Sequence, residues 1–268
     1  MRPFPVSRCI LFALGTSFLL PLAQAQTSTT TSTPVQDPQA IAALQQSYKA
    51  MGGGVPSDSI ANGNIEVIAG TKDSKGTVRI LTRGTGESSL QLTMPDSVRT
   101  TIYSSGQANE INNSAVAVSS LELAVTSQAP EFPVPLIANL LNDPDTSYQY
   151  IGLENLNGVS LQHVRTWDSF ASQPTMQGLV SFSTRDFWID PTSGLLQRLS
   201  YTQRPGSGAV VGVPVDVFYT NYKSLSGVSY PYTIQKSLNG TPWATITIQT
   251  VTFNNGLTDA DFPVQIGG

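Results

Sequence analysis

The sequence predicts a mainly β (α+β) protein whose core is one antiparallel sheet, strongly curled or closed. About eleven short segments alternate between apolar and polar residues. Turn-like stretches separate these segments, and few of them read as helices. The pattern lacks the strand–helix alternation of a parallel sheet and any regular repeat of about 20–50 residues. Many strands with few helices are typical of a single antiparallel sheet.

The clearest predicted hairpin covers residues 187–199. An aromatic strand leads into the turn Asp190-Pro191-Thr192-Ser193-Gly194, and a second apolar strand follows. Pro191 fixes φ at the start of such a turn, and Gly194 can adopt positive φ. A hairpin cannot bury its apolar face alone. We therefore expect further strands on both sides of it.

Residues 1–25 have the features of a cleaved signal peptide. Arg2 and Arg8 precede an apolar run, and Ala-Gln-Ala at 23–25 has the small-x-small pattern of a cleavage site. The apolar run is too short to span a membrane. The sequence predicts export to the periplasm, cleavage before Gln26, and no stable membrane insertion.

Cysteine use and charge exclude several classes of function. Cys9 is the only cysteine, and it lies near the start of the predicted signal peptide. A lipid-anchored export signal needs a cysteine at the cleavage point, so we expect a soluble mature chain without disulfides, catalytic thiols or cysteine metal sites. Losing Arg2 and Arg8 would take the formal net charge from -4 to -6. A mildly acidic domain lacks the basic surface that nucleic acid requires.

The mature chain is predicted to begin with a disordered leader and a helix. Residues 26–36 form a polar, Ser/Thr-rich tract that cannot bury apolar surface. Asp37 is a good N-cap, and Pro38 suits the first helical position. The helix carries one apolar stripe and stops at three glycines, 52–54. The stripe consists of Ile41, Leu44, Tyr48 and Met51.

A meander of antiparallel strands is predicted next, because alternating segments follow one another with short turns between them. The turns include residues 72–76, 84–86 and 94–96. The strands are predicted at 65–67, 78–83, 90–93 and 97–103, with a shorter one at 107–111.

The pattern changes over residues 115–141. Ser119 and Glu122 could form a capping box, but helix and strand remain open for residues 121–125. A short apolar helix is predicted over residues 136–141. Asn142-Asp143-Pro144 would end it.

Strands occupy most of the remaining chain. Asn157-Gly158 and Asn239-Gly240 are strong hairpin signals. Residues 257–262 read as a terminal loop, and residues 37–268 as a single domain. The strands are predicted at 148–153, 159–167, 179–189, 195–203, 213–222, 230–238 and 243–253.

The residues that could carry out catalysis are few. His163 is the only histidine, and no Gly-x-Ser-x-Gly elbow accompanies it. We expect a strand residue that faces solvent or a neighbour, and no metal site around a single histidine. Asp143 and Asp145 read as part of a helix stop, and residues 84–86 are too short to hold phosphate. The sequence thus predicts a protein that is not an enzyme and needs no cofactor.

Three motifs carry a resemblance to a known family. They are Gly152-Leu153-Glu154-Asn155-Leu156-Asn157-Gly158-Val159, the hairpin at 187–199, and Tyr219-Thr220-Asn221-Tyr222 with the residues that follow as far as Pro231. In this order they resemble the LolA/LolB-like superfamily of outer-membrane lipoprotein carriers and sorting proteins. The helix over residues 44–53 is also similar, and the resemblance spans about residues 37–262.

The resemblance implies an incomplete β-barrel with a few helices plugging its concave mouth. The concave apolar face would hold acyl chains. In the lipoprotein carrier a buried arginine holds the lid closed, but Arg79, Arg83 and Arg99 match no family motif. The resemblance therefore supports the fold and a carrier-like role more than lipoprotein trafficking itself.

Strand alternation places several apolar residues on one concave face, where they would line the ligand cavity. Aromatic strand residues could equally serve the core or contact a ligand. The predicted cavity residues are Ile65, Val67, Ile80, Leu90, Leu92, Ile102, Leu136, Ile137, Leu140, Trp188, Leu199 and Phe218.

Two functions from different classes follow. The first is a periplasmic carrier or binding protein for lipid, lipoprotein acyl chains or another apolar ligand, expected to be monomeric. The second is an envelope protein-interaction or stress-sensing domain whose barrel is filled by its own side chains. An open cavity beneath the helices would favour the first function, and a filled one the second.

Overall fold

The computed structural model describes residues 33–69, 72–118, 130–203 and 212–265. Strands make up 56% of the structure, which confirms the predicted mainly β class. The predicted signal peptide lies outside the described residues. So do most of the predicted leader and residues 121–125, for which helix and strand were both open.

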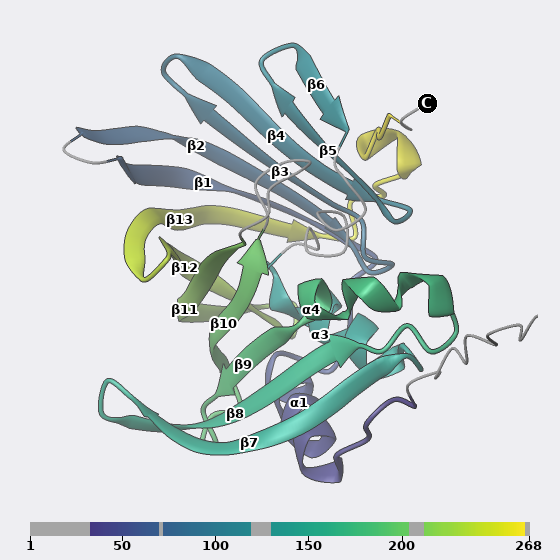
Figure 1. The fold of residues 1–268 in the computed structure, drawn as a ribbon. Coiled ribbons are helices and arrows are strands. Elements are labelled where there is room, and N and C mark those ends of the chain that lie inside the picture. Colours follow the sequence, from purple (N-terminus) through teal and green to yellow (C-terminus); the bar gives the residue numbers. More distant parts are fainter. Residues whose placement is uncertain (1–32, 70–71, 119–129, 204–211, 266–268) are drawn as a thin grey trace, which may run out of the picture. The chain divides into compact units, whose positions relative to one another are not determined.

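One sheet contains all the strands that the structure describes, and every pairing in it is antiparallel. Its order is β6-β5-β4-β3-β2-β1-β13-β12-β11-β10-β9-β8-β7, so β6 and β7 lie at opposite edges and the sheet is not closed into a barrel (Figure 1). The strands are β1 (Asp58–Ala69), β2 (Lys72–Arg83), β3 (Ser88–Met94), β4 (Ser97–Ser104), β5 (Gln107–Asn112), β6 (Ala115–Val118), β7 (Thr146–Leu156), β8 (Val159–Asp168), β9 (Arg185–Ile189), β10 (Leu196–Gln203), β11 (Val213–Leu225), β12 (Val228–Leu238) and β13 (Thr241–Phe253).

Two helices lie against the same side of this sheet: α1 (Pro38–Ala50) and α3 (Pro133–Asn142). The Asp37 side chain accepts hydrogen bonds from the backbone N–H groups of Gln39 and Ala40, which confirms the predicted N-cap. Shorter helical segments are η1 (Pro174–Leu179), α4 (Val180–Ser183) and η2 (Asp259–Asp261).

Several predicted boundaries differ from the structure. The strand predicted at 65–67 begins at Asp58, and the helix predicted at 136–141 begins at Pro133. Residues 179–183 are helical rather than extended. A short apolar run is compatible with the period of a helix and with that of a strand, and the Ser183 hydroxyl favours the helical turn by donating to the carbonyl oxygen of Val180 (2.8 Å). Residues 72–76 belong to β2 rather than to a turn, since β1 and β2 continue to pair there. Residues 115–118 form β6, whose pairing with β5 outweighs the weak local signal.

The two faces of the sheet are different. We call the face that packs on α1 and α3 the inner face, and the opposite one the outer face. Leu92 of β3 and Val164 of β8 belong to one apolar cluster with Leu44 of α1 and Ile137 of α3. Strands far apart in the sheet order therefore share one apolar cluster with the two helices, so the sheet curls around them.

The C-terminal segment covers part of the outer face. Phe262 packs on Leu81 and Ile102 in a second, smaller cluster. Asp58 anchors the approach, because its carboxylate accepts the backbone N–H groups of Gly256 (2.8 Å) and Leu257 (3.0 Å). Burial opposes ionisation of Asp58, but these and the neighbouring hydrogen bonds lower its pKa overall.

Candidate functional site

The inner face is the candidate ligand site, because it gathers most of the predicted cavity residues. Cross-strand pairing brings them together: Ile80 lies opposite Leu90 of β3 and opposite Ala61 of β1. Seven of the twelve belong to the inner apolar cluster, and Val67 and Leu90 pack against it. The seven are Ile65, Ile80, Leu92, Leu136, Ile137, Leu140 and Leu199.

The other three predicted residues lie on the outer face, so their placement on the inner face is wrong. Ile102 pairs with Ser89 rather than with Leu90, which turns it towards Leu81 and Phe262. Trp188 and Phe218 both lie opposite Arg198 and share its face. Successive strand residues alternate between faces, so an error of one residue in register reverses the assignment.

Helix α3 covers the inner face. Seven of its ten residues are buried, as expected for a helix that is apolar on nearly every side. Pro133 takes the first helical position, and Asp143 ends the helix as predicted. The hydroxyl of Tyr148 in β7 donates to the carbonyl oxygen of Leu140, which ties the end of the helix to the sheet edge.

The cavities that lie between the described residues of the inner face are small. A cavity of about 10 Å³ lies beside Phe132 and Leu136, and a second of about 80 Å³ lies beside Leu90. Small-molecule ligands usually occupy roughly 300–1,000 Å³. The α3 side chains therefore occupy the apolar space that a ligand would need.

A buried ion pair interrupts the apolar inner face. Lys236 of β12 contacts Glu131, which lies just before α3, and their side chains are 9% and 1% exposed. Burial disfavours the charged form of Lys236, but the nearby Glu131 carboxylate raises its pKa overall. Both residues line the cavity of about 80 Å³, together with Tyr201 and Thr101.

The sequence of β12 contains a signal for this pair, although Lys236 is absent from the predicted site residues. Ile234, Lys236 and Leu238 alternate along β12, and both apolar members contact the inner cluster. A charged residue in the inward register of a strand needs a buried partner. The sequence does not reveal that the partner is Glu131, because the two residues are 105 positions apart.

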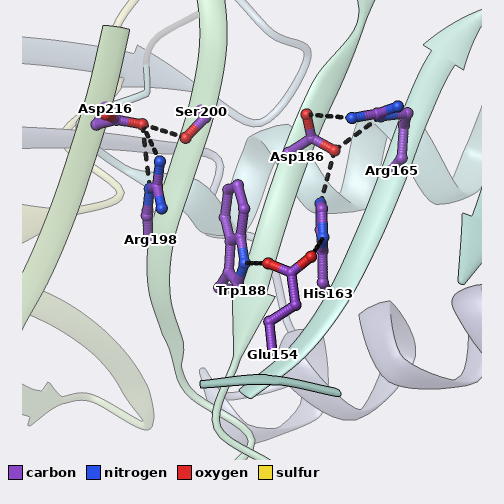
Figure 2. Close-up of polar contacts among 8 residues, drawn as sticks. All are labelled: Glu154, His163, Arg165, Asp186, Trp188, Arg198, Ser200 and Asp216. Atoms are coloured by element: carbon purple, nitrogen blue, oxygen red, sulfur yellow. Dashed lines mark hydrogen bonds and ion pairs between the residues drawn. The ribbon is translucent and has the colours of Figure 1, made fainter. Parts of the chain in front are cut away.

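A polar network lies on the outer face, around His163 of β8 (Figure 2). The Nδ1 atom of His163 is 2.8 Å from Glu154 Oε1, and Nε2 is 2.7 Å from Asp186 Oδ1. Arg165 donates two hydrogen bonds to the Asp186 carboxylate, at 2.8 and 3.2 Å. His163 therefore contacts neighbours, which is one of the two arrangements predicted for it.

Trp188 connects this network to a second ion pair. Its ring stacks on His163 at 4.3 Å between centroids, and its indole N–H donates to Glu154 (2.8 Å). The Arg198 guanidinium lies 4.2 Å from the Trp188 ring centroid and donates to Asp216 at 2.7 Å (Figure 2). The network thus joins strands β7 to β11 by cation–π and charged contacts.

The charges of the network support one another. Hydrogen bonds from Trp188 and His163 lower the pKa of Glu154. Burial raises the pKa of Asp186, but the contacts with His163 and Arg165 outweigh burial, so the pKa is lowered overall. Burial disfavours protonated His163, yet its bonds to Asp186 and Glu154 raise its pKa overall. The network therefore stabilises the positive imidazolium relative to the neutral ring.

This geometry favours a structural role over catalysis. A Ser–His–acid site needs one imidazole nitrogen directed at the nucleophile. Both nitrogens of His163 face carboxylates instead. Across the described ranges, no group of three or more His, Cys, Asp or Glu side chains is arranged to hold a metal ion.

Among the helices that the structure describes, none has the length and the apolar composition that crossing a membrane requires.

Comparisons with known proteins bear on the fold. No protein-family model matches the sequence. No curated protein matches it either. Among solved structures, a LolA superfamily protein from Nitrosomonas europaea aligns with a TM-score of 0.55, 14% identity, and coverage of 84% of this chain and 97% of that one.

This chain has the LolA fold. Two further solved structures have a similar fold, and they align with a similar share of this chain. A domain assigned to outer membrane lipoprotein sorting from Vibrio parahaemolyticus has a TM-score of 0.54 at 13% identity, covering 84% of this chain and 96% of its own. A DUF1329 family protein from Desulfovibrio piger has a TM-score of 0.55 at 14% identity, covering 85% and 98%.

The LolA fold confirms the resemblance seen in the strand and turn motifs. It also agrees with the predicted single curled sheet and incomplete barrel, and the structure shows that β6 and β7 are the two edges of this sheet.

Proposed function

We propose that this chain is an exported periplasmic protein that binds or carries lipid, lipoprotein acyl chains or another apolar ligand on the inner face. The observation that carries the proposal is α3. This helix is not part of the sheet, yet its apolar residues fill the apolar inner face of a LolA fold. Such a helix can move outward while the sheet stays intact.

The ligand would enter between α3 and the sheet. In that position an acyl chain contacts Ile80 and Leu92 on one side and Ile137 on the other, so the helix keeps an apolar partner. A sixteen-carbon chain buried at about 0.8 kcal/mol per CH₂ gains on the order of 13 kcal/mol. Loss of translational freedom and outward movement of α3 oppose this by several kcal/mol. The balance allows roughly micromolar affinity, about -8 kcal/mol.

The names of two similar structures support this proposal. One is a LolA superfamily protein, and the other is a domain assigned to outer membrane lipoprotein sorting. The chemistry of the inner face agrees with such a role, because holding an acyl chain needs apolar surface and no nucleophile or metal.

Uptake of a fluorescent fatty acid methyl ester, which has an acyl chain and no charged head group, tests the proposal. Wild-type protein should bind the probe at tens of micromolar or below, and Leu92→Gln should weaken binding about tenfold, because it places an amide on the inner face. Fluorescence titration measures the affinity, and circular dichroism checks the sheet.

Ile102→Gln is the matched control. Ile102 is similarly buried but lies on the outer face. The control should lose stability to a similar degree and keep uptake. If wild-type protein stripped of lipid by denaturation and refolding takes up no probe, the carrier function is rejected.

A second candidate function is an envelope protein-interaction domain. The observation in its favour is the filled inner face, whose cavities measure about 10 and 80 Å³. A domain of this kind would keep α3 in place permanently and bind its partner elsewhere. The probe experiment separates the two functions, because a permanently filled domain takes up no acyl chain.

A further inference from the structure

The polar cavity of the inner face has the character of a head-group site. It is lined by Leu90 of β3 and Thr101 of β4, and by Tyr201 of β10 and Lys236 of β12. Glu131, just before α3, completes the lining. Its volume is about 80 Å³. The cavity thus combines hydrogen-bonding groups with apolar walls at a place where strands distant in the sheet order approach each other.

The two charged residues that line this cavity pair with each other. Glu131 and Lys236 form an ion pair whose side chains are almost completely buried. A buried charge is tolerated when an opposite charge compensates it, and removing either partner leaves the other uncompensated. The pair therefore offers one strong acceptor and one strong donor while adding no net charge.

The cavity is continuous with the apolar inner face. Ile80 and Leu90 line the cavity and also belong to, or pack against, the inner apolar cluster. An acyl chain lying on the inner face would therefore place a polar group attached to its end beside Glu131 and Lys236.

We propose that this cavity selects lipids with an uncharged, hydroxyl-bearing head, such as monoacylglycerols, and discriminates against fatty acid anions. The inference rests on the proposed function, since it names the ligand class for the same inner face. Glu131 accepts a hydrogen bond from a head-group hydroxyl, and Lys236 donates one to a hydroxyl or ester oxygen.

Electrostatics explains the discrimination. A fatty acid carboxylate would compete with Glu131 for Lys236 and would bring a second negative charge into a buried site. Like charges in a site of low polarity repel strongly, and the carboxylate would also lose its hydration. A hydroxyl group causes neither penalty.

A displacement experiment at pH 8 compares 1-palmitoylglycerol with palmitate as competitors of a bound fluorescent acyl probe. Wild-type protein should bind the glycerol ester at least tenfold more tightly than palmitate. Glu131→Gln leaves Lys236 as an unpaired cation and should increase the relative affinity for palmitate at least tenfold. Lys236→Met leaves the acid and should shift the ratio the other way.

Glu66→Gln is the matched control. Glu66 forms an ion pair of 3.4 Å with Lys75, but both side chains are exposed, at 45% and 75%. Removing this acid changes the net charge by the same amount as Glu131→Gln and should leave the ratio unchanged.

The possible outcomes separate the two proposals. If the probe does not bind, the proposed function fails and the head-group inference fails with it. If the probe binds and wild-type protein prefers palmitate or shows no preference, only the head-group inference is overturned. It is also overturned if the Glu131 and Lys236 variants shift the ratio in the same direction or not at all. The wild-type comparison and the opposite variants decide the question even where one variant does not fold.

Discussion

At the scale of single residues, the charged groups of this protein stabilise the sheet on both faces. On the outer face, both ring nitrogens of His163 form hydrogen bonds with carboxylates. Nδ1 contacts Glu154 of β7, and Nε2 contacts Asp186 of β9. A neutral imidazole donates through only one nitrogen, so only the protonated ring satisfies both contacts. Arg165 and Arg198, on the same face, are each paired with an aspartate. Protonation of His163 therefore strengthens the connection between three neighbouring strands.

The first prediction at this scale concerns pH. The pKa of His163 is raised above its ordinary value of 6.5, so protonation stabilises the folded state. This contribution is fully present below about pH 6.5 and is lost as pH rises through the folded-state pKa. Urea unfolding should show wild-type protein more stable than His163→Gln by about 1–3 kcal/mol at pH 5.5, with a smaller difference at pH 8.5.

The carboxylate partners provide the control for this pH profile. The pKa values of Glu154 and Asp186 are lowered, so their contributions are present at neutral pH and are lost only on acidification below their ordinary range. A difference between the two proteins that is constant from pH 5.5 to 8.5 would contradict the doubly bonded imidazolium.

At the scale of elements, α1 and α3 cover the inner face but are held differently. Asp37 caps α1 and also accepts the backbone N–H of Tyr150 in β7 (2.8 Å), which lowers the pKa of Asp37. Gln46 of α1 donates to the carbonyl oxygen of Pro191 (3.1 Å). Helix α3 has no side-chain cap at its N-terminus, and its buried residues are apolar. Most contacts of α3 are therefore non-directional, and its outward movement has to break only the hydrogen bond from Tyr148 and the Glu131–Lys236 pair besides apolar contacts.

Hydrogen exchange tests the mobility of α3. Its amides should exchange faster than those of β9 and β10, and they should become protected when an acyl ligand binds. Mass spectrometry of peptides covering residues 133–142 and 185–203 measures both effects. Equal protection that does not depend on ligand would identify α3 as a fixed plug and favour the interaction domain.

At the scale of the whole described sheet, one pairing joins its N-terminal and C-terminal strands. β1 pairs with β13 at the centre of the order, so residues 58–69 contact residues 241–253. The register shifts between Asn62 and Gly63. A Cβ atom at Gly63 would clash with the carbonyl oxygen of Thr247, so this close approach of two backbones requires glycine.

Substitution of Gly63 tests the importance of this pairing. Gly63→Ala should lower the free energy of unfolding by about 1–3 kcal/mol, because the two central strands must move apart. Gly54→Ala is the matched control, since no atom in the described structure lies within 4 Å of a Cβ there. The control should change stability by less than about 0.5 kcal/mol. Urea unfolding of both variants provides the measurement, and equal stabilities would contradict the close approach.

Sequence alone determined the features that depend on local chemistry. Asp37 and Pro38 set the start of α1, and the turn at residues 190–194 set the hairpin of β9 and β10, because caps and turns involve residues close in the chain. Alternation within each strand identified the antiparallel sheet. The strand and turn motifs also indicated the LolA fold, which the solved structures confirm.

Only the tertiary structure decided which face each strand presents and which distant residues meet. Ile102 was assigned to the wrong face because alternation fixes the faces within one strand, whereas the pairing register fixes them between strands. The meeting of Glu131 with Lys236 depends on the curl of the whole sheet and on the position of α3. Local sequence patterns do not specify contacts between residues that are 105 positions apart, so the buried ion pair of the inner face could be identified only from the folded structure.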